Sequence, residues 1–327
     1  MAEMPDRNLA LELVRVTEVA AIAAARHQGR GDKEAVDQAA VDAMRQVLST
    51  IDMDGVVVIG EGEKDEAPML YNGEAVGNGN QPEVDVAVDP VDGTRLTARG
   101  MPGALAVIAL APRGTMYAPG SLVLLAKMGV GPARAWTLAI AAPAAHNLAQ
   151  VAKAYDKPVS DVTAIILDRP RNEPFVQAVR GAGARIALIG DGDIQGSIAT
   201  AKTDSGVDIL FGIGGSPEAV TSACAMAALD GEIQAKLWPR DDSERAYAAE
   251  EGLDLNQVLT TRDLVDSDNT FFAATGVTSG DLLKGVRFGS HSVRTNSMVL
   301  RSKTGTVRFM EATHRVEQLR DLASFEL

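Results

Sequence analysis

The sequence of 327 residues contains a single cysteine, Cys224, and relatively few basic residues. One cysteine can form neither an intramolecular disulfide bond nor a cysteine-rich zinc site, so the composition predicts a reducing compartment, the cytoplasm. Lysine and arginine number 31 against 44 aspartates and glutamates, which leaves a net charge of −13. This charge argues against a nucleic-acid partner, because phosphate backbones need a surface rich in lysine and arginine.

Long apolar runs are also missing. No run approaches the roughly 18 residues that a membrane-spanning helix needs, so we expect no membrane partner. The N-terminal stretch carries acids where a signal peptide has a basic segment and an apolar core. Hydrophobic residues nevertheless make up 46% of the chain, which supports a sizeable core and argues against disorder. The length fits one large or two ordinary domains.

The first part of the chain is typical of two helices followed by strands. Residues 8–28 and 32–50 carry apolar residues at helical spacing, and Asp32 is placed to cap the second helix. Apolar stretches then predict strands, which cover residues 56–63, 83–90, 104–111, 121–127 and 133–140.

From about residue 143 the pattern changes to an alternation of helices and strands. Helices are predicted at 143–155, 172–183, 191–202 and 216–231, and strands at 162–168, 184–190 and 207–215. This alternation implies an α/β unit with mostly crossover connections, in which ligands gather where strand ends meet helix starts. Residues 270–310 add further strands, with a hairpin around Lys303-Thr304-Gly305.

Three acidic clusters share one feature, because each follows an apolar strand. They are Gly60–Glu66, Asp89–Thr94 and Gly214–Glu218, and Asp37 lies on the second helix, four residues after Lys33. Mg²⁺ and Mn²⁺ bind several oxygen ligands, commonly carboxylates and phosphate oxygens, from rigid elements that converge. A bound cation would let this acidic chain accept a small phosphorylated substrate. Glycines within the clusters would let the backbone approach a phosphate closely.

Each cluster also has a simpler interpretation. DPVDGT could only be the turn that ends a strand, and Glu218 could only be a favourable charge in the first turn of a helix. Lys33 and Asp37 could form an ordinary surface pair. The conjunction of three acidic clusters with glycines at strand ends favours a metal and phosphate site.

The stretch Asp89-Pro90-Val91-Asp92-Gly93-Thr94 matches the Asp-Pro-(Ile/Val)-(Asp/Glu)-Gly-Thr signature of the lithium-sensitive, metal-dependent sugar and inositol phosphatases. The longer stretches GRGDK, GEGEKDEAPML, VDPVDGTR, DGD, GIGGSPE and SDNTFFAATGVTSGDLL extend the likeness from about residue 8 to the C-terminus. The chain therefore resembles the class II fructose-1,6-bisphosphatases. This resemblance implies an α/β fold, a layered αβαβα sandwich of the sugar phosphatase type. It also implies a cytoplasmic homo-oligomer, dimer or tetramer, that requires Mg²⁺ or Mn²⁺.

The activity implied by the resemblance is hydrolysis of the 1-phosphate of fructose 1,6-bisphosphate, giving fructose 6-phosphate and phosphate in gluconeogenesis. Lys33 falls on an active-site lysine near the phosphate, and Asp65 and Thr94 fall on residues that orient and activate the attacking water. The metal-ligand positions are matched by Asp37, Glu61, Asp89, Asp92 and Glu218. The positions that hold the sugar bisphosphate are matched by Asp92, Gly93, Thr94, Arg169, Arg171, Asp191, Asp193 and Gly215.

Several of these residues allow a second interpretation. Asp65 could be a capping or solvated acid in a loop. Arg169 and Arg171 could end a solvated strand, although an arginine fork beside acidic loops suits a distal phosphate. Asp191 and Asp193 could cap a helix or accept hydrogen bonds from sugar hydroxyls.

We place a boundary near Lys157-Pro158. Residues 1–157 then form an N-terminal α+β half that binds metal and carries the DPVDGT site. Residues 158–327 form a C-terminal α/β half that contributes substrate residues and Glu218.

Two departures from the family pattern lie near the expected sugar pocket. Leu124 stands where members usually carry a tyrosine, unless Tyr117 substitutes from nearby, and Asn172 stands where they carry a histidine. Sedoheptulose 1,7-bisphosphate could therefore be accepted too. The alternatives are an inositol monophosphate or other sugar phosphatase, which needs no second phosphate clamp, and a non-catalytic metal and sugar-phosphate sensor, which needs no water-activating pair. Cys224 is predicted to be a buried packing residue.

Overall fold

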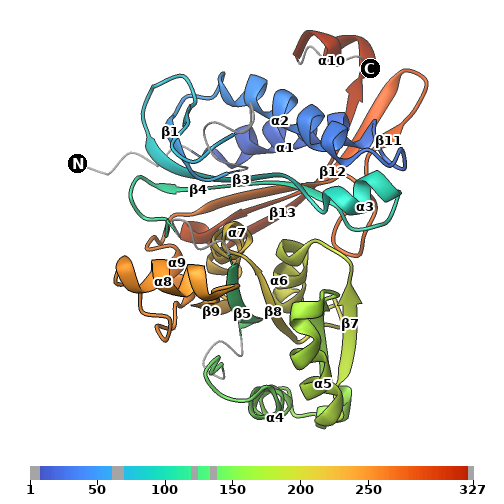
Figure 1. Cartoon of the computed structure of the whole chain (residues 1–327). Coiled ribbons are helices and arrows are strands. Elements are labelled where there is room, and N and C mark those ends of the chain that lie inside the picture. The colour runs from blue at the N-terminus through green and yellow to red at the C-terminus, as the bar shows by residue number, and fades with distance from the viewer. Residues whose placement is uncertain (1–7, 61–69, 119–123, 133–137, 323–327) are drawn as a thin grey trace.

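A computed structural model describes residues 8–60, 70–118, 124–132 and 138–322. Figure 1 shows five layers, in which helices α1 and α2 cover one face of a first sheet and α6 and α7 lie between it and a second sheet. Helices α4 and α5 cover the outer face of the second sheet. The predicted α/β fold with αβαβα layers is confirmed.

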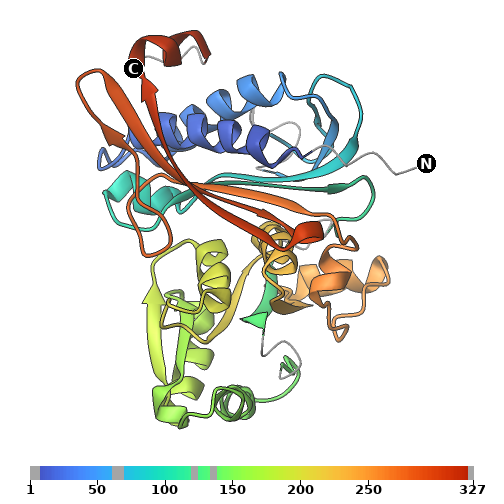
Figure 2. The same cartoon turned by 180° about the vertical axis from the view of Figure 1, so that it is seen from behind.

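The first sheet has eight strands in the order β11-β12-β10-β4-β3-β1-β2, with β13 paired to β12. Neighbouring strands are antiparallel except β1 and β3. Figure 2 shows β12 and β13 as long strands on the far side of the view in Figure 1. The turn Ser302–Thr304 joins them and confirms the predicted hairpin. The strands are β1 (Asp54–Ile59), β2 (Ala75–Val76), β3 (Glu83–Asp92), β4 (Leu105–Pro112), β10 (Phe271–Gly276), β11 (Arg287–Phe288), β12 (Ser292–Arg301) and β13 (Thr306–Arg315).

The second sheet has five strands in the order β7-β6-β8-β5-β9. Strand β6 is parallel to β7 and β8, as the helix–strand alternation predicts, whereas β5 runs antiparallel to β8 and β9. Each sheet contains strands from both sides of residues 157–158, so this boundary does not divide the chain into one half per sheet. The division into two halves stays a prediction. The strands are β5 (Leu124–Val130), β6 (Thr163–Leu167), β7 (Arg185–Ile189), β8 (Ile209–Gly215) and β9 (Glu232–Leu237).

Side-chain caps begin three of the described helices, α2, α8 and α9. Asp32 accepts a hydrogen bond from the Ala35 N–H at 3.0 Å and so caps α2 as predicted. The helices are α1 (Ala10–Ala25), α2 (Lys33–Leu48), α3 (Thr94–Arg99), α4 (Ala144–Ala154), α5 (Glu173–Gly181), α6 (Asp193–Ala201), α7 (Ser216–Ala228), α8 (Asp242–Glu250), α9 (Thr261–Leu264) and α10 (Val316–Leu322), with short 3₁₀ turns at Val159–Asp161 and Pro170–Asn172. In the described part of the chain, no helix is long and apolar enough to cross a membrane.

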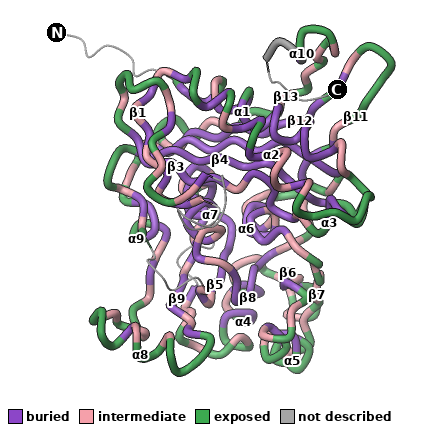
Figure 3. The backbone as a smooth tube through the Cα atoms, turned by 45° about the horizontal axis from the view of Figure 1, so that its top comes forward, coloured by how far each residue is buried: buried purple, intermediate pink, exposed green. Residues whose placement is uncertain are grey.

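The sequence of strand β4 is a continuous apolar run because both faces of the strand are covered. Ile108 and Leu110 pack toward α1 and α2, whereas Val107 and Ala109 belong to the core on the α7 side. A strand covered on both faces needs apolar residues at every position. Figure 3 shows β3, β4 and α7 as mostly buried. Cys224 on α7 is fully buried, as predicted.

One predicted strand is partly wrong. Residues 138–140 are not in a strand, and residues 133–137 lie outside the described part of the chain. Side chains, and not a neighbouring strand, accept the hydrogen bonds of the backbone N–H groups in this segment. Asn147 Oδ1 accepts from the Ala139 N–H at 2.9 Å, and Gln234 Oε1 accepts from the Ile140 N–H at 2.9 Å. Residues 124–127 of the strand predicted at 121–127 belong to β5, which continues to Val130, whereas residues 121–123 lie outside the described part of the chain.

Asp85 on β3 provides a test of how the first sheet is held. Its carboxylate is 2% exposed and accepts hydrogen bonds from the Thr115 and Met116 N–H groups at 2.8 and 3.0 Å. We expect Asp85→Ala to lower the free energy of unfolding by about 2–4 kcal/mol, because two covered N–H groups lose a charged acceptor. Asp85→Asn, which keeps one acceptor, should lose less. Urea unfolding measures both, and an equal loss would contradict this account.

Candidate active site

The DPVDGT stretch lies at the end of β3 and the start of α3. The strand continues through both aspartates to Asp92, and its register with β4 shifts between Asp89 and Asp92. The Asp89 carboxylate accepts a hydrogen bond from the Val91 N–H at 3.1 Å, which holds this irregular segment. Gly93 then adopts φ of 100°, a conformation that favours glycine, and α3 begins at Thr94. The segment is thus the irregular end of a strand, not only a turn.

Thr94 and Asp37 are brought together from positions 57 residues apart. The Thr94 hydroxyl donates to Asp37 Oδ1 at 2.6 Å, and the Val91 carbonyl oxygen lies 3.1 Å from it. Burial raises the pKa of Asp37 from 3.8 to about 6, while the Thr94 hydrogen bond and the charge of Lys33 oppose this rise. Two predicted site residues therefore form one hydrogen-bonded pair.

The end of β8 carries two glycines that make room for acidic side chains. A β-carbon on Gly215 would collide with the Glu218 carboxylate, and one on Gly214 would collide with the carboxylate of Asp193. Asp193 begins α6 and Glu218 lies in the first turn of α7. The sequence GIGGSPE is thus explained by close packing at the start of α7.

We call Asp92, Asp193 and Glu218 the acidic pocket. Asp92 is 5% and Asp193 4% exposed. Asp92 Oδ2 and Glu218 Oε2 are buried without a hydrogen-bond partner among the described residues. Burial, followed by the charge of Asp193, raises the pKa of both Asp92 and Glu218. The pocket therefore concentrates carboxylates, two of which have a covered oxygen without a hydrogen-bond partner among the described residues.

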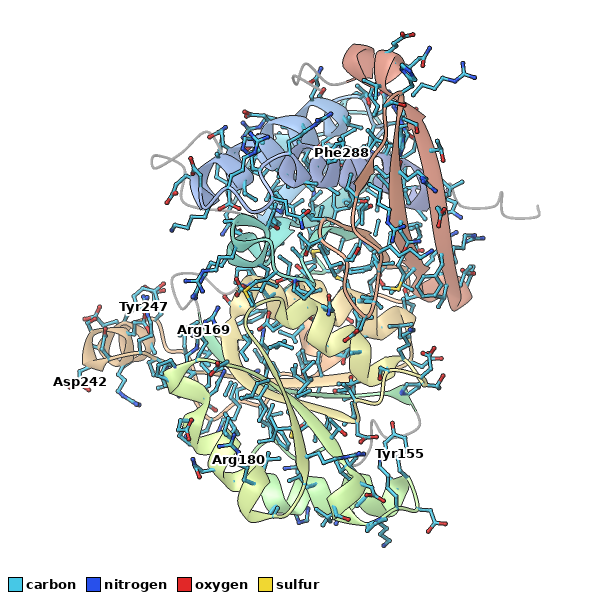
Figure 4. All side chains as sticks on the ribbon, turned by 90° about the vertical axis from the view of Figure 1, so that its right-hand side faces the viewer. Tyr155, Arg169, Arg180, Asp242, Tyr247 and Phe288 are labelled. Atoms are coloured by element: carbon cyan, nitrogen blue, oxygen red, sulfur yellow. The ribbon has the colours of Figure 1, made fainter. Side chains whose placement is uncertain are left out.

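The arginines predicted to bind a phosphate lie beside this pocket. Arg169 Nη2 pairs with Asp191 Oδ1 at 2.8 Å, and Arg171 Nε donates to the Ile213 carbonyl oxygen at 2.8 Å. Burial and the charge of Arg169 lower the pKa of Arg171, while Asp193 and Glu218 oppose this. Burial raises the pKa of Asp191, and Arg169 opposes the rise. Figure 4 shows Arg169 on the side of the second sheet that faces the first.

Other predicted residues are less closely engaged or cannot be placed. The Lys33 side chain is 62% exposed and lies 3.3 Å from Glu34, so it stands at the surface above Asp37 on the same helix. Glu61 and Asp65 lie outside the described residues. Across the ranges that the structure describes, no group of three or more histidine, cysteine, aspartate or glutamate side chains is arranged to hold a metal ion. The five-ligand set stays a prediction.

Lys127 is the site residue that sequence reasoning missed. It lies on β5, its side chain is 1% exposed, and its ammonium group forms an ion pair with Asp193 Oδ2. The available signal was a lysine within the apolar strand LLAKMGV, because a lysine is almost never fully buried without a partner.

The two family departures have different surroundings. Asn172 is fully buried, donates to the Leu167 carbonyl oxygen at 3.0 Å and accepts from the Ile213 N–H at 2.7 Å. It therefore braces β6 against β8. Tyr117 packs beside the core on the α7 side of the first sheet, and Leu124 is partly buried on β5.

Comparison with known proteins identifies the family of this chain. The chain matches, over residues 7–314, the family described as bacterial fructose-1,6-bisphosphatase, glpX-encoded. The chain is 43% identical over 326 residues to fructose-1,6-bisphosphatase 1 class 2 of Escherichia coli strain K12. The aligned region covers 95% of this chain and 96% of that protein. The same identity and coverage are found for fructose-1,6-bisphosphatase class 2 of Shigella flexneri. The chain belongs to the bacterial class 2 fructose-1,6-bisphosphatase family.

Proposed function

We propose that the protein hydrolyses the 1-phosphate of fructose 1,6-bisphosphate to give fructose 6-phosphate and phosphate, as a step of gluconeogenesis. Membership of the family supports this activity and disfavours both an inositol phosphatase and a sensor. The observation that carries the proposal is the acidic pocket, whose unpartnered oxygens lie beside the Thr94–Asp37 pair and the Arg169–Asp191 pair.

The pocket suits Mg²⁺ or Mn²⁺, because these cations prefer carboxylate oxygens and the buried oxygens of Asp92 and Glu218 have no partner among the described residues. The residues that would hold the cation are Asp37, Glu61, Asp89, Asp92 and Glu218. Bound there, it would neutralise phosphate charge and make a water molecule more acidic.

The protein's own groups would position the reactants. The Asp37 carboxylate fixes the Thr94 hydroxyl, which can orient the attacking water, and Asp65 would accept the proton from that water. Lys33 would approach the phosphate from the surface. Phosphate-ester hydrolysis depends mainly on such positioning and on charge neutralisation.

The sugar and the distal phosphate would occupy the neighbouring groups. Arg169 and Arg171 carry fixed positive charges next to the acidic residues, which suits a second phosphate. Asp191 and Asp193 would accept hydrogen bonds from sugar hydroxyls. The backbone of Asp92–Thr94 and of Gly215 would complete the site around the reacting phosphate.

We also propose that the protein works in the cytoplasm as a homo-oligomer, a dimer or a tetramer. Cys224 is a free, buried thiol, which is compatible with a reducing compartment. Val307 and Phe309 on β13 are 41% and 54% exposed, and a second copy could cover such apolar groups on a long strand.

The activity is tested by phosphate release from fructose 1,6-bisphosphate with Mg²⁺, with Mn²⁺ and with EDTA. We expect turnover with either cation and its loss in EDTA, because the carboxylates need a counter-charge. Sedoheptulose 1,7-bisphosphate and inositol 1-phosphate serve as comparison substrates. Mn²⁺ binding without turnover of any ester would instead support the sensor.

Arg171 is tested by Arg171→Ala, with Arg180→Ala on the exposed side of α5 as the matched control. We expect the KM for fructose 1,6-bisphosphate to rise about 10- to 100-fold, since a charge-assisted hydrogen bond contributes about 1.5–3 kcal/mol. The KM for fructose 1-phosphate should change much less. Equal effects on both esters would remove Arg171 from the distal phosphate.

Asp37 predicts how stability depends on pH without metal. Its pKa is raised from 3.8 to about 6 in the folded protein, so the folded state binds the proton more tightly and loses stability as pH rises through this range. In EDTA, Asp37→Asn should therefore be more stable than the wild type above pH 6, by about 1–2 kcal/mol after solvent screening, with the difference shrinking toward pH 4. Urea unfolding at several pH values measures this. A difference that is constant with pH would refute the assignment.

A further inference from the structure

Lys127 is held inside the acidic pocket by contacts from two elements. Its ammonium group forms the ion pair with Asp193 at the start of α6 and lies 3.4 Å from the Gly215 carbonyl oxygen, just before α7. Both side chains of the pair are almost fully buried. The lysine thus contacts both helix starts that carry acidic pocket residues.

The surrounding backbone is shaped for this ion pair. A β-carbon on Gly214 would collide with the Asp193 carboxylate and with the end of the Lys127 side chain. Gly192, just before Asp193, is favoured for a different reason, because it adopts φ of 84° while a β-carbon there would make only ordinary contacts. A residue with a β-carbon at position 214 would therefore displace the Asp193 carboxylate or the end of the Lys127 side chain, so Gly214 leaves room for the ion pair.

The charges of the pocket are unequal. The acidic pocket has three carboxylates, of Asp92, Asp193 and Glu218, and the ammonium of Lys127 forms an ion pair with Asp193 among them. The charge of Lys127 also lowers the pKa of Asp92 and Glu218 and so partly opposes burial. Asp193 is therefore compensated by the protein itself, whereas the covered oxygens of Asp92 and Glu218 are not.

We propose that Lys127 is a positioning residue that withholds Asp193 from the metal ligands and reserves it for the substrate. The proposal rests on the proposed function and deepens it, because it assigns why one buried carboxylate of the pocket binds sugar while its neighbours bind cation. Removing the ammonium would leave Asp193 as an uncompensated carboxylate beside the cation site, where a divalent cation is the available counter-charge.

The test measures Mn²⁺ binding to substrate-free protein by calorimetry at mildly alkaline pH, where protons compete little. We expect Lys127→Met to bind Mn²⁺ about tenfold more tightly than the wild type, equivalent to about 1.4 kcal/mol. The double variant Lys127→Met/Asp193→Asn should lose this gain, because the freed carboxylate is then absent. Ordinary structural damage would change affinity in the opposite direction.

The matched control is Lys157→Met. Lys157 pairs with Asp208 at 2.7 Å at the far end of the second sheet, and its removal should leave Mn²⁺ affinity unchanged. Unchanged or weaker binding by folded Lys127→Met overturns the proposal, as does a gain that persists in the double variant. Lys127→Gln is the second neutral variant if Lys127→Met fails to fold, and unfolding of both would make the lysine structural and overturn the proposal.

Kinetics separate this proposal from the proposed function. With fructose 1,6-bisphosphate, Lys127→Met should raise KM more than it lowers kcat, because Asp193 no longer faces the sugar. A wild-type protein that lacks phosphatase activity would refute the proposed function but leave the Mn²⁺ comparison valid. An active wild type with unchanged Mn²⁺ affinity in both lysine variants would refute only the role of Lys127.

Discussion

The repulsion among buried carboxylates is the constraint on which the site depends. Asp92 and Asp193 are buried and one oxygen of Glu218 is covered. Burial and the charge of Asp193 raise the pKa of Asp92 and of Glu218, so the charged forms of these two groups are costly without positive charge nearby. The chain supplies one fixed ammonium, from Lys127, and leaves two covered oxygens without partners among the described residues. The described residues leave this charge only partly compensated, which is the property expected of a phosphatase that binds a metal ion.

The layered fold keeps these charges close in spite of their repulsion. Asp92 ends a strand of the first sheet, whereas Asp193 and Glu218 begin the helices packed between the two sheets. Each sheet contains strands from residues 1–157 and from residues 158–327. These two parts of the chain therefore cannot separate without breaking hydrogen bonds between strands. Apolar packing on both faces of β4 and around α7 supplies the free energy that holds the acidic groups together.

The sequence predicts well those elements of the fold that local sequence patterns determine. The helix at 32–50 with its Asp32 cap, the hairpin at 303–305 and the alternation from residue 143 depend on local patterns, and the structure contains all three. The Lys127–Asp193 pair and the Thr94–Asp37 pair depend on tertiary contacts, which spacing along a chain does not encode. The strand predicted at 133–140 is wrong at residues 138–140, because Asn147 and Gln234 satisfy that backbone from other elements.

Tertiary contacts also explain the two departures from the family pattern, at Asn172 and Leu124. Asn172 differs from the family histidine, yet both ends of its amide bind backbone groups of neighbouring strands, so it acts on the alignment of β6 with β8. Arg171, the preceding residue, donates to the Ile213 carbonyl oxygen. Ile213 thus contacts both residues, because its N–H group donates to Asn172. A change at position 172 can therefore act on the substrate indirectly, through the backbone that Arg171 also contacts. Leu124 lies three residues before Lys127 on β5, the strand that reaches the pocket.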